Sequence, residues 1–157
     1  MGSVVAMIFV GLLLSASPAF PWSGECVRVI SGDTIVVKHD GKFVEIGLHG
    51  ISCPKWGQNF ALEATQFTEN IVTGKPLEVM PQKGKSRLRT FANVSVEKLS
   101  LNEELVRAGL AWWQENYAPN DLTLAEVHVQ AMKNKVGIWS DSDPVPPWKF
   151  RAPAEPK

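Results

Sequence analysis

The chain has 157 residues, of which 45% are hydrophobic, so it is long enough for one domain with a buried core. Lys and Arg number 16, as do Asp and Glu, so the formal net charge is +0. This balance excludes attraction of the whole molecule to nucleic acid or anionic lipid by bulk charge, and any polyanion site must come from a local patch of cations.

The N-terminus carries the pattern of an export signal. An uncharged apolar run, Val4–Leu14, is too short to span a bilayer comfortably. The small residues Ser17-Pro18-Ala19 follow it, so we expect residues 1–19 to be a signal peptide and the mature protein to begin near Phe20. No Lys or Arg precedes the run, and the alternative is a retained anchor or a buried strand. We expect a secreted or periplasmic bacterial protein without membrane association after cleavage.

The chain has two cysteines, Cys26 and Cys53. In an oxidising compartment such a pair suggests a disulfide, but the sequence does not give their separation, so the redox state stays open. Together with the three histidines they do not have the spacing of a metal cluster.

The next segment predicts three consecutive β-strands. Val27 and Val29 alternate with polar residues, and residues 34–37 are all β-branched. Asp40-Gly41 is typical of a two-residue hairpin turn, and a turn at Ser31-Gly32 joins the first two strands. The predicted strands begin near residue 25 and cover 34–37 and 43–46.

Predicted helices then alternate with two further predicted strands. Apolar residues on one face predict a helix over Ala61–Val72, and Leu101–Ala108 predicts a second that stops at Gly109. The strands between them cover 77–80 and 90–96. For the last helix, Thr123 to Glu126 reads as a capping box, and Gly137 is expected to end it.

Composition divides the chain after the signal peptide into one domain and a C-terminal tail. We expect a single domain over residues 25–140 and a Pro-rich C-terminal tail over 141–157, without internal repeats. Five short strands with three helices predict a small, β-rich α+β domain.

Several short segments occur in an order and spacing that resemble the staphylococcal nuclease (thermonuclease) family, secreted bacterial type. They are SGDT at 31–34, GISCP at 50–54, the helix with Glu63-Ala64, LNEELVRAGLA at 101–111, GIWS at 137–140 and PPWKFR at 146–151. The resemblance covers residues 26–140 and implies a five-stranded OB-type barrel with three helices. It also implies hydrolysis of DNA and RNA phosphodiesters with bound calcium.

The resemblance maps the family's active site onto this chain with losses. Asp33 falls on a metal-ligand position and is followed by Thr34, and Arg89 falls on an arginine that neutralises the phosphate. Three further positions are replaced: Gly47 stands for the first arginine, Ser52 for the second metal-binding aspartate, and Lys55 for the glutamate that acts on the attacking water.

These replacements predict a degenerate active site. Calcium needs several oxygen ligands, and its affinity depends on their charge, so Asp33 beside a neutral Ser52 and a cationic Lys55 makes a poor site. We therefore expect no cofactor in this protein, and calcium only if it is an active enzyme. The alternative role for Asp33 is to cap backbone amides in its turn.

Cations at every second position predict a basic row if their segment is extended. The row consists of Lys83, Lys85, Arg87 and Arg89, and Lys55 would extend it. Such a row can bind the phosphate backbone of a nucleic acid, with Tyr117 as a surface on which a base stacks. The alternative interpretation is that these charges only solvate a strand or loop.

Two more features have competing interpretations. Glu45 and His49 flank Gly47 at a spacing of two, so on a regular strand they share its side of the sheet and offer a substitute acid–base pair. We favour His49 as a filler of the barrel interior or rim, and expect Trp112-Trp113 to pack under the last helix.

Three functions remain open from the sequence. The first is a catalytically impaired module that binds DNA, RNA or another polyanion outside the cytoplasm. The second is an active nuclease with a rearranged site. The third is a structural or protein-interaction domain, and in each case we expect a monomer.

Overall fold

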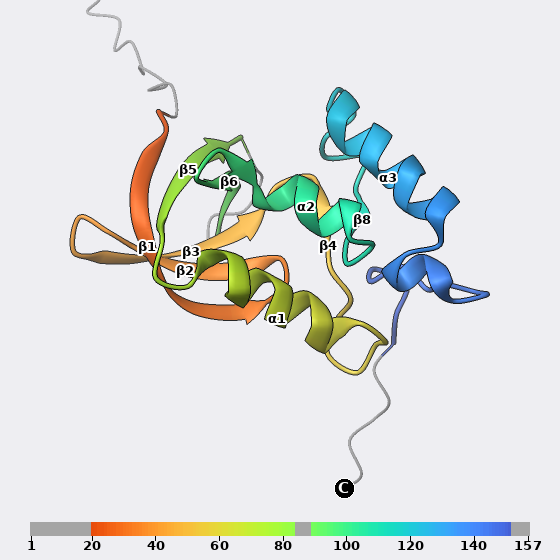
Figure 1. Cartoon of the computed structure of the whole chain (residues 1–157). Coiled ribbons are helices and arrows are strands. Elements are labelled where there is room, and N and C mark those ends of the chain that lie inside the picture. The colour runs from red at the N-terminus through yellow and green to blue at the C-terminus, as the bar shows by residue number, and fades with distance from the viewer. Residues whose placement is uncertain (1–19, 84–88, 152–157) are drawn as a thin grey trace, which may run out of the picture.

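A computed structural model describes residues 20–83 and 89–151. Its centre is a closed barrel of five strands (Figure 1). These are β1 (Trp22–Ser31), β2 (Thr34–His39), β3 (Lys42–Leu48), β5 (Pro76–Gln82) and β6 (Thr90–Val96). The strands follow the order β3-β2-β1-β5-β6, and parallel pairing between β3 and β6 closes the ring. With three α-helices in the described residues, this confirms the predicted OB-type fold.

Three two-residue strands complete the sheets. β4 (Ile51–Ser52) pairs antiparallel with β8 (Trp112–Trp113), and β7 (Leu99–Ser100) extends the barrel sheet beside β6. The sequence did not predict them, because two residues are too few to show a period.

The meander of the first three strands is confirmed. Asp40 and Gly41 both have positive φ, 47° and 75°, as a two-residue turn between right-twisted strands requires. β1 pairs with two neighbouring strands, since its first part, from Trp22 to Glu25, pairs with β5 and its second part, from Glu25 to Ser31, pairs with β2. Register shifts in β1 bend it enough to close a small barrel.

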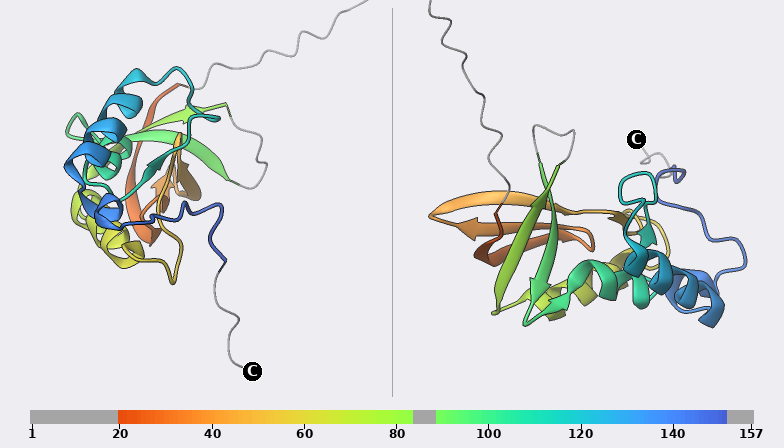
Figure 2. Two further views of the ribbon diagram at one scale, coloured as in Figure 1. Left: turned by 90° about the vertical axis from the view of Figure 1, so that its right-hand side faces the viewer. Right: turned by 90° about the horizontal axis from the view of Figure 1, so that it is seen from above.

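The helices lie on one side of the barrel, and α3 lies farthest out (Figure 2). They are α1 (Ala61–Val72), α2 (Leu101–Arg107) and α3 (Leu122–Asn134). α1 buries Ala64 and Thr68, and the Thr68 hydroxyl donates to the Gly32 carbonyl at 2.7 Å. Of the described helices, none is long and apolar enough to cross a membrane.

The start of α3 differs from the prediction. Asp121, not Thr123, is the N-cap residue, and its Oδ1 accepts a hydrogen bond from the Leu124 amide at 2.9 Å. Thr123 lies inside the first turn. Both residue types are good caps, so local sequence alone did not distinguish two candidates two residues apart.

The predicted end of α3 at Gly137 was also wrong. The helix ends at Asn134, with Lys135 in the left-handed conformation. Gly137 instead opens a 3₁₀ helix, η1 (Gly137–Ser140), where a Cβ would lie 2.2 Å from the Gly109 carbonyl oxygen. Close backbone contact between two distant loops therefore requires this glycine.

A buried asparagine connects α2 to the barrel. Asn102 is 2% exposed, and its Oδ1 accepts from the Val94 amide at 3.0 Å. Its Nδ2 donates to the carbonyls of His49 at 2.9 Å and Ala92 at 3.4 Å. One side chain thus joins the helix, strand β6 and the turn that follows β3.

Aromatic side chains hold α3 and η1 against β8, as predicted for the two tryptophans. The rings of Trp112 and Trp139 meet edge to face, with centroids 4.4 Å apart. The His128 ring lies 5.1 Å from Trp139 and 6.2 Å from Trp113. Burial lowers the pKa of His128, because the charged imidazolium would lose its hydration among these rings.

We predict that Asn102→Ala lowers the free energy of unfolding by about 2–4 kcal/mol, because it leaves buried polar groups of Val94 and His49 without partners. Urea denaturation measures the change. The exposed Asn134→Ala is the control, with an expected change within about 0.5 kcal/mol. Equal small effects for both variants would contradict the role given to Asn102.

We also predict that acid destabilises the protein through His128. Its pKa is lowered from 6.5 in the folded chain, so below that pH the unfolded state binds the proton first. Stability is therefore fully present above the unfolded pKa and falls as pH drops toward the folded one. His128→Phe should reduce the loss seen in urea melts between about pH 7.5 and 5, while the similarly lowered His49 retains part of it. An unchanged pH slope in the variant would refute this.

Candidate anion and nucleotide site

The barrel register brings the predicted site positions together. Thr34 pairs with Gly47, Gly47 pairs with Phe91, and Phe91 pairs with Gln82, so one row crosses β2, β3, β6 and β5. Paired residues present their side chains to the same face of a sheet. Asp33 precedes one end of this row, and Arg89 immediately precedes β6.

Asp33 is tied into its turn by hydrogen bonds. Its Oδ1 accepts from the hydroxyls of Ser31 at 2.8 Å and Thr34 at 3.1 Å. Its Oδ2 accepts from the Cys53 amide at 2.8 Å, which draws the segment after β4 against the β1–β2 turn. The capping role considered for Asp33 is thus present in the structure, and Thr34 is one of its donors.

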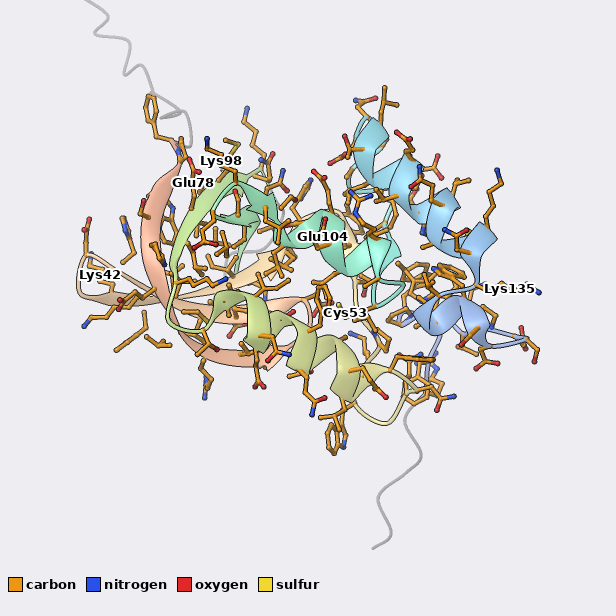
Figure 3. The ribbon with its side chains drawn as sticks, viewed as in Figure 1. Lys42, Cys53, Glu78, Lys98, Glu104 and Lys135 are labelled. Atoms are coloured by element: carbon orange, nitrogen blue, oxygen red, sulfur yellow. The ribbon has the colours of Figure 1, made fainter. Side chains whose placement is uncertain are left out.

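Ser52 and Lys55 lie on either side of this contact. Ser52 is 7% exposed and pairs with Trp112, whereas Lys55 is exposed on the loop before α1. Cys53 is buried in the interior (Figure 3), and burial, with a smaller effect of the Asp33 charge, raises the pKa of its thiol well above the usual value. Cys53 and Cys26 are both free thiols in the structure.

The absence of a side chain at Gly47 makes room for Arg89. A Cβ at Gly47 would lie 2.9 Å from Arg89 Cδ and 2.9 Å from Phe91 Cε1. Arg89 instead crosses this gap and donates from Nη2 and Nε to Glu45 Oε1, at 2.6 and 2.7 Å. This charge-assisted contact joins two positions that the sequence treated separately.

The described side chains do not fit a calcium ion. Residues 20–83 and 89–151 contain no group of three or more His, Cys, Asp or Glu side chains that could hold a metal. Asp33 already accepts three hydrogen bonds, Ser52 is neutral, and Glu45 is paired with Arg89. A hard divalent cation requires more anionic oxygen than this.

Only part of the predicted basic row is described. Lys83 follows the end of β5 and is exposed, and Arg89 stands opposite it before β6. The pairing of Gln82 with Phe91 places both cations at one end of the hairpin. Lys85 and Arg87 lie outside the described residues.

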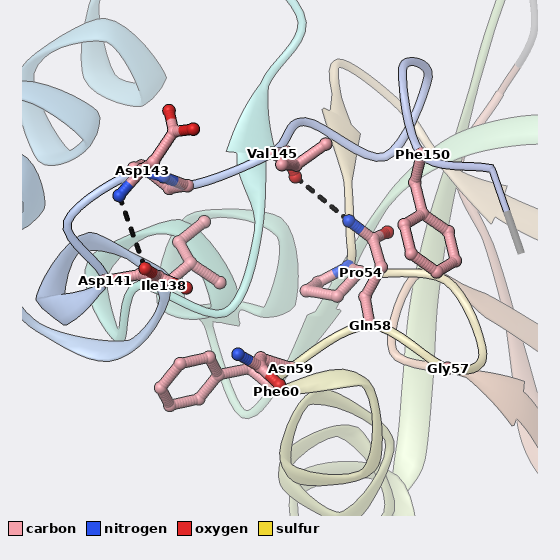
Figure 4. A pocket seen from close by; sticks show the side chains of 11 residues that line it. Pro54, Gly57, Gln58, Asn59, Phe60, Ile138, Asp141, Asp143, Val145 and Phe150 are labelled. Carbon is pink, nitrogen blue, oxygen red and sulfur yellow. Dashed lines mark hydrogen bonds between the residues drawn. The ribbon is translucent and has the colours of Figure 1, made fainter. Parts of the chain in front are cut away.

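The loop that carries Lys55 is held by the C-terminal segment. Gln58 accepts from the Lys55 amide through Oε1 at 2.7 Å and donates through Nε2 to the Val145 carbonyl at 2.9 Å. A cavity of about 210 Å³ separates the two segments elsewhere, with Phe150 beside Gly57 (Figure 4). Trp148 also meets Trp112 edge to face, at 5.8 Å.

A second hollow lies farther along the outer face of the barrel. It holds about 580 Å³ and is lined by the residue after β3, the last residue of β5, the middle of β6 and the loop before α3. Tyr117, 68% exposed, and the half-buried His49 are predicted residues that line it. Gln82 and Asn93 also line it, and the sequence did not identify them because isolated amides on strands carry no functional signal.

His49 is not part of strand β3, which ends at Leu48. Its backbone amide donates to the Ala92 carbonyl at 2.9 Å, at the end of the parallel pairing. Burial lowers the pKa of His49, and the charge of Asp121 opposes this only in part. The predicted position at the barrel rim is confirmed.

Comparison with known proteins supplies independent information. Residues 45–141 match the family model described as "Staphylococcal nuclease homologue". An "Uncharacterized endonuclease" of Escherichia coli is 36% identical over 129 residues, which cover 82% of this chain and 84% of the relative.

Two further relatives have names that state a nuclease. A "Micrococcal nuclease" of Shigella flexneri is 28% identical over 151 residues, covering 89% of this chain and 87% of the relative. A "Thermonuclease" of Staphylococcus hyicus is 33% identical over 126 residues, covering 73% and 74%.

Proposed function

Because the chain belongs to the staphylococcal nuclease family, we propose that it is a nucleic-acid-binding module whose hydrolytic site is impaired. The observation that carries this proposal is the environment of three charged residues at the site. Asp33 acts as a turn cap, Arg89 is paired with Glu45, and Lys55 replaces a carboxylate of the family pattern.

The loss of catalysis follows from electrostatics. Without a second carboxylate, the site has little charge to hold a divalent cation, and the ammonium of Lys55 opposes one. Loss of a general base typically costs about 10²–10⁴ in rate, and loss of a charge-stabilising donor about 10²–10³. The carboxylate of Glu45, which also lies at the site, is paired with Arg89.

The same replacements favour a simple anion site. Lys55, Lys83 and Arg89 are cations around the Asp33 turn and the end of the β5–β6 hairpin. Phosphate contacts need cations and little geometry, so they support binding without sequence specificity. Lys85 and Arg87 would add to this surface. We propose that the protein acts after export, as the N-terminal pattern predicts.

An active nuclease with a rearranged site is the second candidate. The names of the relatives favour it, and so does the contact between Glu45 and Arg89, which places a carboxylate beside the retained arginine. His49, with its lowered pKa, is largely neutral near pH 7 and so is able to accept a proton.

Incubation of the purified protein with plasmid and single-stranded DNA, with calcium or with a chelator, separates these functions. We predict salt-dependent retention of single-stranded DNA without cleavage under both conditions. Lys83→Gln and Arg89→Gln should each weaken binding and lower the salt slope by about 1, whereas the exposed Lys133→Gln on α3 should not. Acid-soluble product that requires calcium and Arg89 would establish the nuclease instead. If the protein neither retains nor cleaves DNA, the remaining function is that of a structural or protein-interaction domain.

Restoring the family pattern tests the proposed loss directly. Gly47→Arg, Ser52→Asp and Lys55→Glu together should create calcium binding, with Kd of about 10⁻⁴–10⁻³ M, because two carboxylates join Asp33. Calorimetry measures the heat of binding. The matched control is Gly47→Arg, Ser52→Asn and Lys55→Gln, which has similar shapes without the charges and should bind no calcium. If the charged triple variant gives no heat, the assignment of these positions is wrong.

A further inference from the structure

The outermost helix, α3, is apolar on two opposite faces. The residues of its inner face are buried against the rest of the chain: Leu124, Val127 and Ala131. Its outer face presents Leu122, Val129 and Met132, which are 79%, 53% and 46% exposed. A helix at the surface of a globular protein ordinarily has one apolar face, with polar residues opposite. Packing within the chain therefore accounts for the inner face of α3 and not for the outer one.

The exposed apolar residues of α3 form a continuous stripe. Leu122, Ala125, Val129 and Met132 follow one another at spacings of three, four and three residues. This is the spacing at which apolar side chains line the seam between two packed helices. Val136, which is 36% exposed, continues the spacing just beyond the end of the helix. Scattered apolar residues are normal on a surface, but a continuous row of them marks a place where another molecule binds.

Charged residues beside the stripe make this face complementary to itself. Glu126 and Lys133 are both exposed and lie on the same flank of the stripe, about two helical turns apart. Their midpoint falls between Val129 and Gln130, at the centre of the stripe. When two copies pack antiparallel about a two-fold axis through this point, Glu126 of each lies opposite Lys133 of the other. The antiparallel arrangement also places the dipoles of the two helices in a favourable orientation.

The position of α3 leaves its outer face accessible to a second molecule. The helices lie on one side of the barrel, and α3 lies farthest from it (Figure 2). On the inner face, the His128 ring packs against Trp139 with centroids 5.1 Å apart. The stripe is thus presented from a helix that is already fixed, which lowers the entropy lost on association.

We propose that the chain associates with a second copy of itself through this stripe, with the two α3 helices antiparallel and Glu126 of each copy paired with Lys133 of the other. The inference is independent of the proposed function, and it replaces the monomer expected from the sequence. A contact confined to one helix per copy is small, below about 1,200 Å² in total, and suits reversible association. We expect a Kd of about 10⁻⁵–10⁻⁴ M. At the far lower concentrations used to measure DNA binding the chain is a monomer, so Lys133→Gln remains a neutral control there.

Sedimentation equilibrium of the purified protein, over a range of concentrations around this Kd, tests the inference. Glu126→Lys and Lys133→Glu should each raise the Kd of self-association at least about tenfold, because attractive contacts become repulsive ones on both sides of the two-fold axis. An equimolar mixture of the two variants should recover the Kd of the unaltered protein, since every contact between unlike copies again joins Lys to Glu. This recovery also shows that both variants are folded.

Lys42→Glu is the matched control for Lys133→Glu. It makes the same change of charge at an exposed position of the β2–β3 hairpin, away from α3 (Figure 3), and should leave the Kd unchanged. If the unaltered protein stays a monomer at the highest concentration, or if the mixture associates as weakly as each variant alone, the inference is refuted. Equal association in all samples would place the contact elsewhere, for instance at the apolar residues 4–14, and would refute it as well.

Discussion

The parallel pairing of β3 with β6 is the constraint on which the rest of the structure depends. It closes the barrel and places Gly47 beside Phe91, so that the β2–β3 and β5–β6 hairpins share one outer face. Asn102 fixes the end of this pairing with hydrogen bonds to Val94, Ala92 and His49. Because the asparagine is buried, these bonds act at low dielectric and cannot be exchanged for water. The contact between Arg89 and Glu45 across Gly47 follows from this closure.

One residue, Asp33, belongs both to the contacts that maintain the fold and to the positions that the resemblance maps to the active site. Asp33 combines both roles in principle, but its bonds to Ser31, Thr34 and the Cys53 amide already account for its presence. The place of Asp33 in the turn therefore does not depend on a bound metal ion.

The gap at Gly47 changes how Arg89 is used. Because Gly47 has no side chain, the backbone leaves room for the Arg89 side chain to reach Glu45. A phosphate that approaches Arg89 must compete with this carboxylate, which favours reversible, salt-sensitive contact over tight capture.

Local patterns predicted the elements well where the signal was strong. The Asp40-Gly41 turn, the helix Ala61–Val72 and strand Thr90–Val96 agree with the structure, because turn chemistry and periodicity act over a few residues. The start of α3 was misplaced because Asp121 and Thr123 are both competent caps. Gly137 was misread because its positive φ serves contact with Gly109, which is distant in sequence.

The chain's own residues were enough to identify the family and the barrel with three helices, since these depend on order and spacing along the chain. The mapping of Gly47, Ser52 and Lys55 onto replaced active-site positions stays a prediction from the same spacing. The tertiary structure alone decided that Arg89 pairs with Glu45, that both thiols are free, and that Gln82 and Asn93 join Tyr117 around one hollow. The physical reason is that these contacts join residues of different strands and loops. Strand register and barrel closure determine which of these residues meet, and no local pattern encodes either of them.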